Sequence, residues 1–203
     1  MMQSELGKLE LLTPQNSVLV LVDFQPSMFK GVASGDKARI KTAAVCAARA
    51  AKILDVPVVL SSIDPKLNGE FIKEITDLFP GVVVPAREVP SFDAFEDKKT
   101  WITFLQTGKH KVVLAGLWTS MCFAFTAVQA VRQGYEVYGL MDAAGDSTIE
   151  AHKYGIKRMM QVGVVPLTLE ALVSEWMHDW NNPKAGELVK EVYSQFGGMI
   201  GWH

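Results

Sequence analysis

Cys122 occupies a position at which a thiol could act as a nucleophile. It ends the stretch VVLAGLWTSMC (residues 112–122), in which an apolar run typical of a buried strand passes into the opening turn of a predicted helix. Unpaired N–H groups and the helix dipole at such a turn lower the pKa of a thiol and can bind an oxyanion. Because free cysteine is also among the most often buried residue types, a packing role stays open for Cys122. Cys46, in an alanine-rich segment, is interpreted as core packing.

Two charged residues that could support this thiol end other predicted strands. Asp23 ends the strand predicted at 17–23, and Arg87 ends the strand predicted at 81–87. A carboxylate can take the thiol proton and return it to a leaving group, and a guanidinium can counter the negative charge that results. Each residue also has a structural interpretation, since Asp23 could cap a loop and Arg87 could form a surface salt bridge. Their positions at strand ends, together with that of Cys122, favour a shared site.

The elements that must position these residues alternate between strand and helix, which predicts an α/β domain with a parallel sheet between two helical layers. We expect one Rossmann-like domain over 1–203, with a core at about 15–180 and six strands in the order 3-2-1-4-5-6. That order would place Asp23 and Cys122 across one cleft. The predicted strands are 17–23, 56–62, 81–87, 110–116, 135–142 and 162–168. The predicted helices are 37–54, 71–79, 94–108, 119–133, one opened by a capping-box pattern at 147–150, and 169–180.

The C-terminal extension at 181–203 is too apolar to be a free end. We expect it to pack on the core or on a neighbouring subunit. Its apolar residues are Val189, Val192, Tyr193, Phe196, Ile200 and Trp202.

Composition disfavours several classes of function. The 203 residues carry a net charge of −2, with acidic and basic residues interleaved, so we expect neither nucleic-acid nor membrane binding. The N-terminus has no basic and apolar segments of the signal-peptide kind, and two cysteines make no disulfide framework, so we expect a cytoplasmic protein. The four histidines show no ligand spacing, and we expect no metal and no other cofactor.

Taken together, these motifs resemble the isochorismatase-like (cysteine hydrolase) superfamily. The family patterns are D-x-Q after the first strand, a basic residue after the third, G-x-x-T-x-x-C after the fourth, and G-[YF]-x-V followed by D-A. Here they are matched at 23–25, at Arg87, at 116–122, and at 134–137 with 142–143. The stretch EWMHDWNN and Arg87 further resemble the YcaC-like branch.

The resemblance implies a catalytic triad of Asp23, Arg87 and Cys122. It also implies a cis peptide between Leu117 and Trp118, which turns the N–H groups of Trp118 and Cys122 toward an oxyanion. The implied reaction is thiolate attack on an amide-type carbon of a small molecule, loss of ammonia or an amine, and hydrolysis of the thioester. A homo-oligomer, tetramer or octamer, is implied as well.

This sequence departs from the family pattern in two ways. The usual basic member of the triad is Lys, whereas this chain has Arg87, which keeps the charge but cannot donate a proton at neutral pH. The metal-binding Asp-x-His…His of the nicotinamidase branch is replaced by SSIDPKLNGEF (61–71), which disfavours nicotinamidase activity. Family members that act on isochorismate lack the cysteine, so Cys122 disfavours that substrate.

Three residues near the triad in sequence are candidates for a substrate pocket: Phe24, Gln25 and Trp118. A lined apolar pocket would favour a small, partly apolar amide, but the sequence assigns no substrate. Two other functions stay open, a redox-active thiol protein and a non-catalytic oligomeric assembly.

Overall fold

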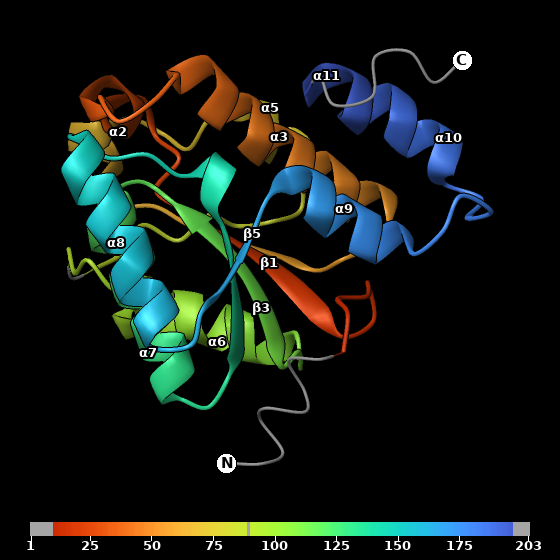
Figure 1. Cartoon of the computed structure of the whole chain (residues 1–203). Coiled ribbons are helices and arrows are strands. Elements are labelled where there is room, and N and C mark those ends of the chain that lie inside the picture. Colours follow the sequence, from red (N-terminus) through yellow and green to blue (C-terminus); the bar gives the residue numbers. More distant parts are fainter. Residues whose placement is uncertain (1–9, 89, 197–203) are drawn as a thin grey trace.

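A parallel five-stranded sheet forms the centre of the protein (Figure 1). The computed structural model describes residues 10–88 and 90–196. The strand order is β2-β1-β3-β4-β5. Over its full length β1 pairs with β3, with Val22 opposite Gly116, so the chain leaves both strands at the same edge. The strands are β1 (Ser17–Val22), β2 (Val58–Ser61), β3 (Lys111–Gly116), β4 (Glu136–Leu140) and β5 (Val165–Leu167).

Helices cover both faces of the sheet (Figure 1). One face packs against α3 (Lys37–Ile53) and α9 (Leu169–Met177), and the other against α6 (Lys98–Gln106), α7 (Ala124–Arg132) and α8 (Ile149–Gln161). The shorter elements are α2 (Pro26–Gly31), α4 (Pro65–Asn68), α5 (Lys73–Thr76), α10 (Ala185–Leu188), α11 (Ser194–Phe196), the 3₁₀ turns η1 (Ala94–Glu96) and η3 (Met141–Ala143), and the π-helical turns η2 (Thr119–Phe123) and η4 (Val189–Tyr193).

Alternation along β1 explains why the sheet is covered on both sides. Leu19 and Leu21 join the core beneath α3, whereas Val18 and Val20 join the core beneath α7. Burial of each such side chain stabilises the fold by about 1.5–3 kcal/mol. Strand β1 is therefore held in place from both faces, which fixes the position of Asp23 directly after it.

The predicted strand at 81–87 is wrong. This segment forms one isolated parallel bridge, between Ala86 and Ser62. Pro85 has no N–H to donate to a ladder, and Val83 is 78% exposed while Val82 and Val84 are only partly buried, so the apolar run is not covered on both faces. The sheet therefore has five strands, in the predicted order once that strand is removed. The segment still lies beside the end of β2, where the third strand was expected.

Two predicted helices are shorter or broken. The helix predicted at 71–79 is reduced to α5, and the one predicted at 94–108 is divided at Asp97 between η1 and α6. Asp97 has an extended backbone, and its carboxylate accepts the N–H of Thr100 at 2.8 Å. The break therefore arises because Asp97 caps the start of α6.

Helix α8 begins one residue later than the capping-box pattern predicted. The N-cap is Thr148, whose hydroxyl oxygen accepts the N–H of Ala151 at 3.0 Å. Ser147 instead donates its N–H to the Asp146 carboxylate at 2.8 Å. Because Thr148 is the N-cap, the N–H of Ser147 donates to Asp146, which also contacts the turn that carries Cys122.

The C-terminal segment lies against α3 and α9. The hydroxyls of Tyr193 and Ser174 are 2.9 Å apart, and Tyr193 is buried together with Val192. Ile200 and Trp202 lie outside the described residues. Within the described ranges, no helix is both long and apolar enough to cross a membrane.

Candidate active site

Three segments far apart in the sequence bring Asp23, Arg87 and Cys122 together. Arg87 Nη2 donates to Asp23 Oδ2 at 2.6 Å and lies 3.8 Å from Cys122 Sγ. The side chains of Asp23 and Arg87 are fully buried, and Cys122 is 5% exposed. The group lies where the chain leaves β1 and β3, at the carboxyl edge of the sheet. One guanidinium therefore contacts both a carboxylate and a thiol away from bulk water.

The two polar residues of the D-x-Q pattern, Asp23 and Gln25, contact different parts of the protein. Asp23 has a φ of 60°, in the left-handed region that Asp tolerates better than most residues, and its carboxylate contacts Arg87. Gln25 holds the loop after β2, because its side-chain nitrogen donates to the carbonyls of Ile63 and Gly69 at 3.1 and 2.7 Å. Its side-chain oxygen accepts the N–H of Ile63 at 2.9 Å. The amide of Gln25 is therefore engaged with this loop.

Cys122 lies in the π-helical turn η2 rather than in the opening turn of a regular α-helix. The peptide bond between Leu117 and Trp118 is cis, as the resemblance implied. The Trp118 carbonyl accepts the N–H groups of Met121 and Phe123 at 3.1 and 3.3 Å. The wider turn places Cys122 between two residues that are bonded to the same carbonyl.

Asp146 anchors this turn to the rest of the protein. It is fully buried, and its Oδ2 and Oδ1 accept the N–H groups of Ser120 and Ser147 at 2.7 and 2.8 Å. Its own N–H donates to the hydroxyl of Ser34 at 2.8 Å, and its carbonyl accepts the N–H of Ala33 at 2.8 Å. Asp146 is not among the residues predicted from the sequence, because nothing but its place four residues after Asp142 marks it.

Helix α8 packs directly against the same turn. His152 Nδ1 lies 2.8 Å from the hydroxyl oxygen of Thr119. A side chain at Gly155 would place its Cβ 2.9 Å from the Ser120 Cα. The turn is therefore held on one side by Asp146 and on another by the close approach of α8.

The expectation that the turn lowers the pKa of the Cys122 thiol is wrong for this structure. Burial raises the pKa of Cys122 above its usual range, the nearby Asp23 carboxylate raises it further, and Arg87 opposes both effects. Burial also raises the pKa of Asp23, against the lowering effect of Arg87. Because a buried guanidinium stays charged and needs a counter-ion, we assign an ionised Asp23–Arg87 pair beside a neutral thiol at neutral pH.

Two polar atoms of the group are left unpaired. Among the described residues, neither Asp23 Oδ1 nor Arg87 Nε has a hydrogen-bond partner. Unpaired buried polar atoms are uncommon, and they occur at sites where a group is held ready for a ligand or a reaction. Asp23 Oδ1 is thus free to accept a proton.

The three residues expected to line a pocket lie in different surroundings. Phe24 is fully buried, with its ring 5.9 Å from that of Phe29. The indole N–H of Trp118 donates to the Met28 carbonyl at 2.9 Å, and its ring packs against Gly31 of α2. With the Gln25 amide engaged as described, a pocket role for Phe24, Gln25 and Trp118 stays a prediction.

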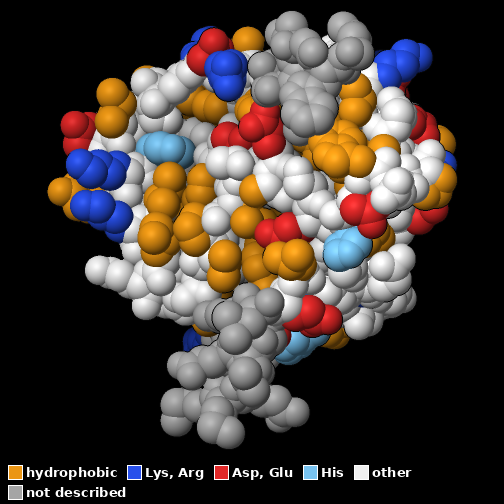
Figure 2. Space-filling model, turned by 45° about the vertical axis from the view of Figure 1, so that its right-hand side comes forward, with side chains coloured by type: hydrophobic (Ala, Val, Ile, Leu, Met, Phe, Trp, Pro, Cys, Tyr) orange, Lys and Arg blue, Asp and Glu red, His pale blue; other side chains and the backbone are white. Residues whose placement is uncertain are grey.

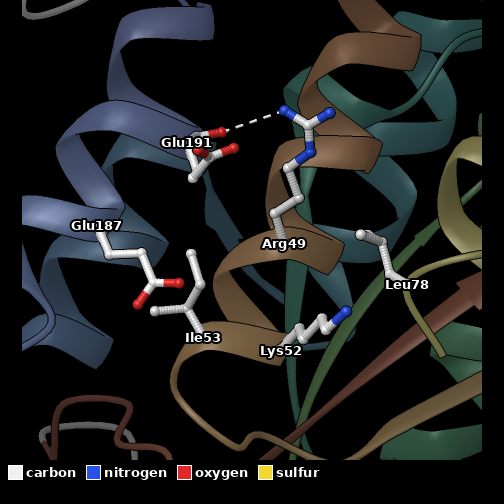
Figure 3. Close-up of a pocket in the computed structure, with 6 residues that line it drawn as sticks. All are labelled: Arg49, Lys52, Ile53, Leu78, Glu187 and Glu191. Carbon is white, nitrogen blue, oxygen red and sulfur yellow. Dashed lines mark hydrogen bonds between the residues drawn. The ribbon is translucent and has the colours of Figure 1, made fainter.

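A cavity lies elsewhere, between α3 and the C-terminal segment (Figure 3). It has a volume of about 310 Å³, and its charged residues include Arg49 and Glu191. Arg49 donates to the backbone carbonyl of Glu191 at 3.4 Å. A neighbouring cavity of about 320 Å³ is lined in part by Cys46. Over residues 10–88 and 90–196, no three His, Cys, Asp or Glu side chains form a metal-binding cluster.

Comparison with known proteins supports the relationship that the motifs indicated. The family profile described as "Isochorismatase domain" matches residues 17–171. The chain is 26% identical over 176 residues to "Probable hydrolase YcaC" of Escherichia coli (strain K12), covering 86% of this chain and 84% of that protein.

Two solved structures have closely similar folds. The structure of Escherichia coli YcaC, described as an octameric hydrolase of unknown specificity, matches with a TM-score of 0.86 and 25% identity over 92% of each chain. YcaC from Pseudomonas aeruginosa, solved with hexane-2,5-diol and covalent acrylamide, matches with a TM-score of 0.86 and 22% identity over 92% of this chain and 94% of that chain. Because the family profile spans well over half of its length, this chain belongs to the isochorismatase family.

Proposed function

We propose that this protein is a cysteine hydrolase that cleaves a C–N bond of a small amide through a thioester on Cys122. The observation that carries the proposal is the single guanidinium of Arg87 in contact with both Asp23 and Cys122 in a buried site. A purely structural cysteine does not need an ion pair beside it, and a buried ion pair is costly to maintain.

The first half of the reaction forms the thioester. Because the pKa of the thiol is raised, its proton passes to Asp23 Oδ1 as Sγ attacks the carbonyl carbon, rather than before. The S–C bond forms, and the carbonyl oxygen becomes an oxyanion held by the N–H groups of Trp118 and Cys122. Arg87 cannot donate a proton at neutral pH, so Asp23 returns the proton to nitrogen as the C–N bond breaks.

The second half of the reaction releases the acid. A water molecule attacks the thioester carbon and gives its proton to Asp23 as the new C–O bond forms. The C–S bond then breaks, and the proton returns to Cys122 Sγ. Arg87 offsets the negative charge of the Asp23 carboxylate before each attack and that of the oxyanion after it, which is the role left to a residue that keeps its charge.

Acrylamide is a suitable probe because it is a small primary amide with an electrophilic double bond. It is present as a covalent group in the Pseudomonas aeruginosa YcaC structure. In the proposed labelling, Sγ of Cys122 bonds to the terminal alkene carbon, and the proton ends on the adjacent carbon. Labelling tests whether the thiol is reactive, and ammonia release from other small amides tests turnover.

The deciding experiment compares the wild type with Cys122→Ala and with the matched control Cys46→Ala. We expect one acrylamide on the Cys122 peptide by mass spectrometry, and ammonia release from at least one amide of a panel. Both should be lost in Cys122→Ala and kept in Cys46→Ala. Equal labelling of the two cysteines, without ammonia release from any amide, would overturn the proposal and favour a redox or structural role.

We also propose that the protein assembles as a homo-oligomer, a tetramer or an octamer. Large hydrophobic side chains are exposed in the described chain, among them Ile149 at 63% and Tyr154 at 61%, and Figure 2 shows hydrophobic side chains gathered in groups between charged ones on one face. Escherichia coli YcaC is described as octameric. Light scattering during size-exclusion chromatography tests this, and a monomer at micromolar concentration would refute it.

A further inference from the structure

The guanidinium of Arg87 has a third contact, made by its other terminal nitrogen. Its Nη1 donates to the hydroxyl oxygen of Ser61, the last residue of β2, at 3.2 Å. Ser61 is fully buried. Asp23 and Cys122 are both contacted by Nη2. The contact of Nη1 with Ser61 therefore fixes the orientation of the guanidinium plane.

Ser61 also contacts a second buried hydroxyl, that of Thr100, which in turn contacts the carboxylate of Asp97. The Thr100 hydroxyl oxygen lies 3.4 Å from that of Ser61 and 3.0 Å from Asp97 Oδ2. Each hydroxyl has one proton to donate and lone pairs with which to accept. If Thr100 donates to Asp97, it can accept from Ser61, and Ser61 is then free to accept from Arg87. The polar groups therefore form one continuous series from cation to carboxylate.

We propose that Ser61 is a positioning residue, which together with Thr100 and Asp97 holds the guanidinium of Arg87 in contact with both Asp23 and Cys122. The proposal rests on the proposed hydrolase function. It also gives a physical reason for arginine at position 87, since a planar guanidinium offers donors in several fixed directions and an ammonium does not.

Loss of the Ser61 hydroxyl would free one end of the guanidinium. Nη1 would lose its acceptor, and Nε already has no partner among the described residues. The group could then turn about its remaining contact with Asp23, which would move its charge relative to Cys122. Because Arg87 lowers the pKa of Cys122, a displaced guanidinium should make the thiolate harder to form.

The test compares Ser61→Ala with the matched control Ser62→Ala. Ser62 is the next residue and is also buried, but its hydroxyl donates to the Pro85 carbonyl at 3.2 Å. Ser62 contacts Arg87 only through its backbone carbonyl, which accepts the Arg87 N–H at 3.0 Å and is kept in the variant. The readout is the rate of acrylamide labelling of Cys122 against pH, with the melting temperature measured beside it. We expect Ser61→Ala to react about tenfold more slowly at neutral pH, with its profile displaced to higher pH.

The control, Ser62→Ala, should have a lower melting temperature but the wild-type labelling rate and the wild-type pH profile of labelling. Wild-type labelling in Ser61→Ala, or equal slowing in both variants, would overturn the inference. Failure of this inference would appear in the labelling rates of the variants. Failure of the proposed function would appear instead as a wild-type protein that hydrolyses no amide, so the two failures are distinguishable.

Thr100 tests the longest link of the series. Thr100→Val removes the hydroxyl and nearly keeps the shape of the side chain. The backbone N–H of residue 100 can still donate to the Asp97 carboxylate, which caps α6. We expect Thr100→Val to slow labelling in the same direction as Ser61→Ala but by less, and Thr100→Ser to restore the wild-type rate. If the Ser variant is as slow as the Val variant, the hydroxyl is not what matters and the series does not extend beyond Ser61.

Discussion

The two cysteines of this protein are both buried but have different neighbours. Cys46 is 1% exposed and Cys122 is 5% exposed, and burial is the largest cause of a raised pKa for both. Cys46 lies in the alanine-rich helix α3, where its Sγ is 3.9 Å from the Val192 carbonyl. Cys122 lies instead in a π-helical turn beside a buried ion pair. Burial therefore does not distinguish the two thiols, whereas the buried ion pair beside Cys122 does.

Asp23→Asn should have the largest effect, and it should separate two roles of the carboxylate. Without a base to accept the thiol proton, hydrolysis of an amide substrate should fall by about 10²–10⁴-fold. Removal of the negative charge should also lower the pKa of Cys122, because Asp23 raises it, so alkylation by iodoacetamide at neutral pH should become faster. Stopped assays of ammonia release and of iodoacetamide incorporation measure the two effects. Slower alkylation would contradict the charge arrangement described here.

The pH dependence of labelling sharpens the comparison between the two thiols. Burial raises the pKa of Cys46 to about 11 and raises that of Cys122 as well, so both are protonated near neutral pH. Because the thiolate is the nucleophile, iodoacetamide labelling should rise about tenfold per pH unit between about pH 7 and pH 9. Site-resolved mass spectrometry of the native protein gives both profiles. A plateau for Cys122 below about pH 8 would show that its thiolate is already formed.

Asp146→Asn should have a smaller effect, through the turn that carries Cys122. An amide has one acceptor oxygen in place of two, so one of the N–H groups of Ser120 and Ser147 loses its partner. We expect a loss of about 1–3 kcal/mol in the free energy of unfolding and about tenfold slower labelling of Cys122.

The matched control for this variant is Asp142→Asn. Asp142 accepts the N–H of Leu169 at 3.0 Å and so caps α9, away from the turn. Asn keeps one acceptor oxygen for this single N–H, so the control should lose less stability than Asp146→Asn and should not change the labelling rate. If both variants slow labelling alike, the effect reflects general loosening of the fold rather than the position of the turn.

Cys46→Ala should have the smallest effect. We expect a loss of about 1 kcal/mol in the free energy of unfolding from the small cavity left in α3, and an unchanged labelling rate at Cys122. Urea denaturation and acrylamide labelling measure the two quantities. If native Cys46 reacts as fast as Cys122, the contrast between the two thiols breaks down.

The sequence allowed the main features of the candidate site to be predicted, because Asp23 directly follows β1, Cys122 lies in the turn after β3, and the ends of these two parallel strands are level. Arg87 was identified although its strand was not formed, since one bridge suffices to hold the segment beside β2. The direction of the Cys122 pKa was not predictable, because it depends on how completely the site is buried. Ser61 and Thr100 were missed because buried hydroxyls have no sequence signal of their own.

Gly155 shows how far the requirements of the turn that carries Cys122 extend into the rest of the chain. Glycine in the middle of a helix costs about 1 kcal/mol relative to alanine, so α8 is weaker than its length would allow. The methyl group that would strengthen this helix would collide with the backbone of Ser120. The protein thus tolerates a weaker helix so that the backbone beside Cys122 keeps its place, and a substitution that favours the helix there would displace that backbone.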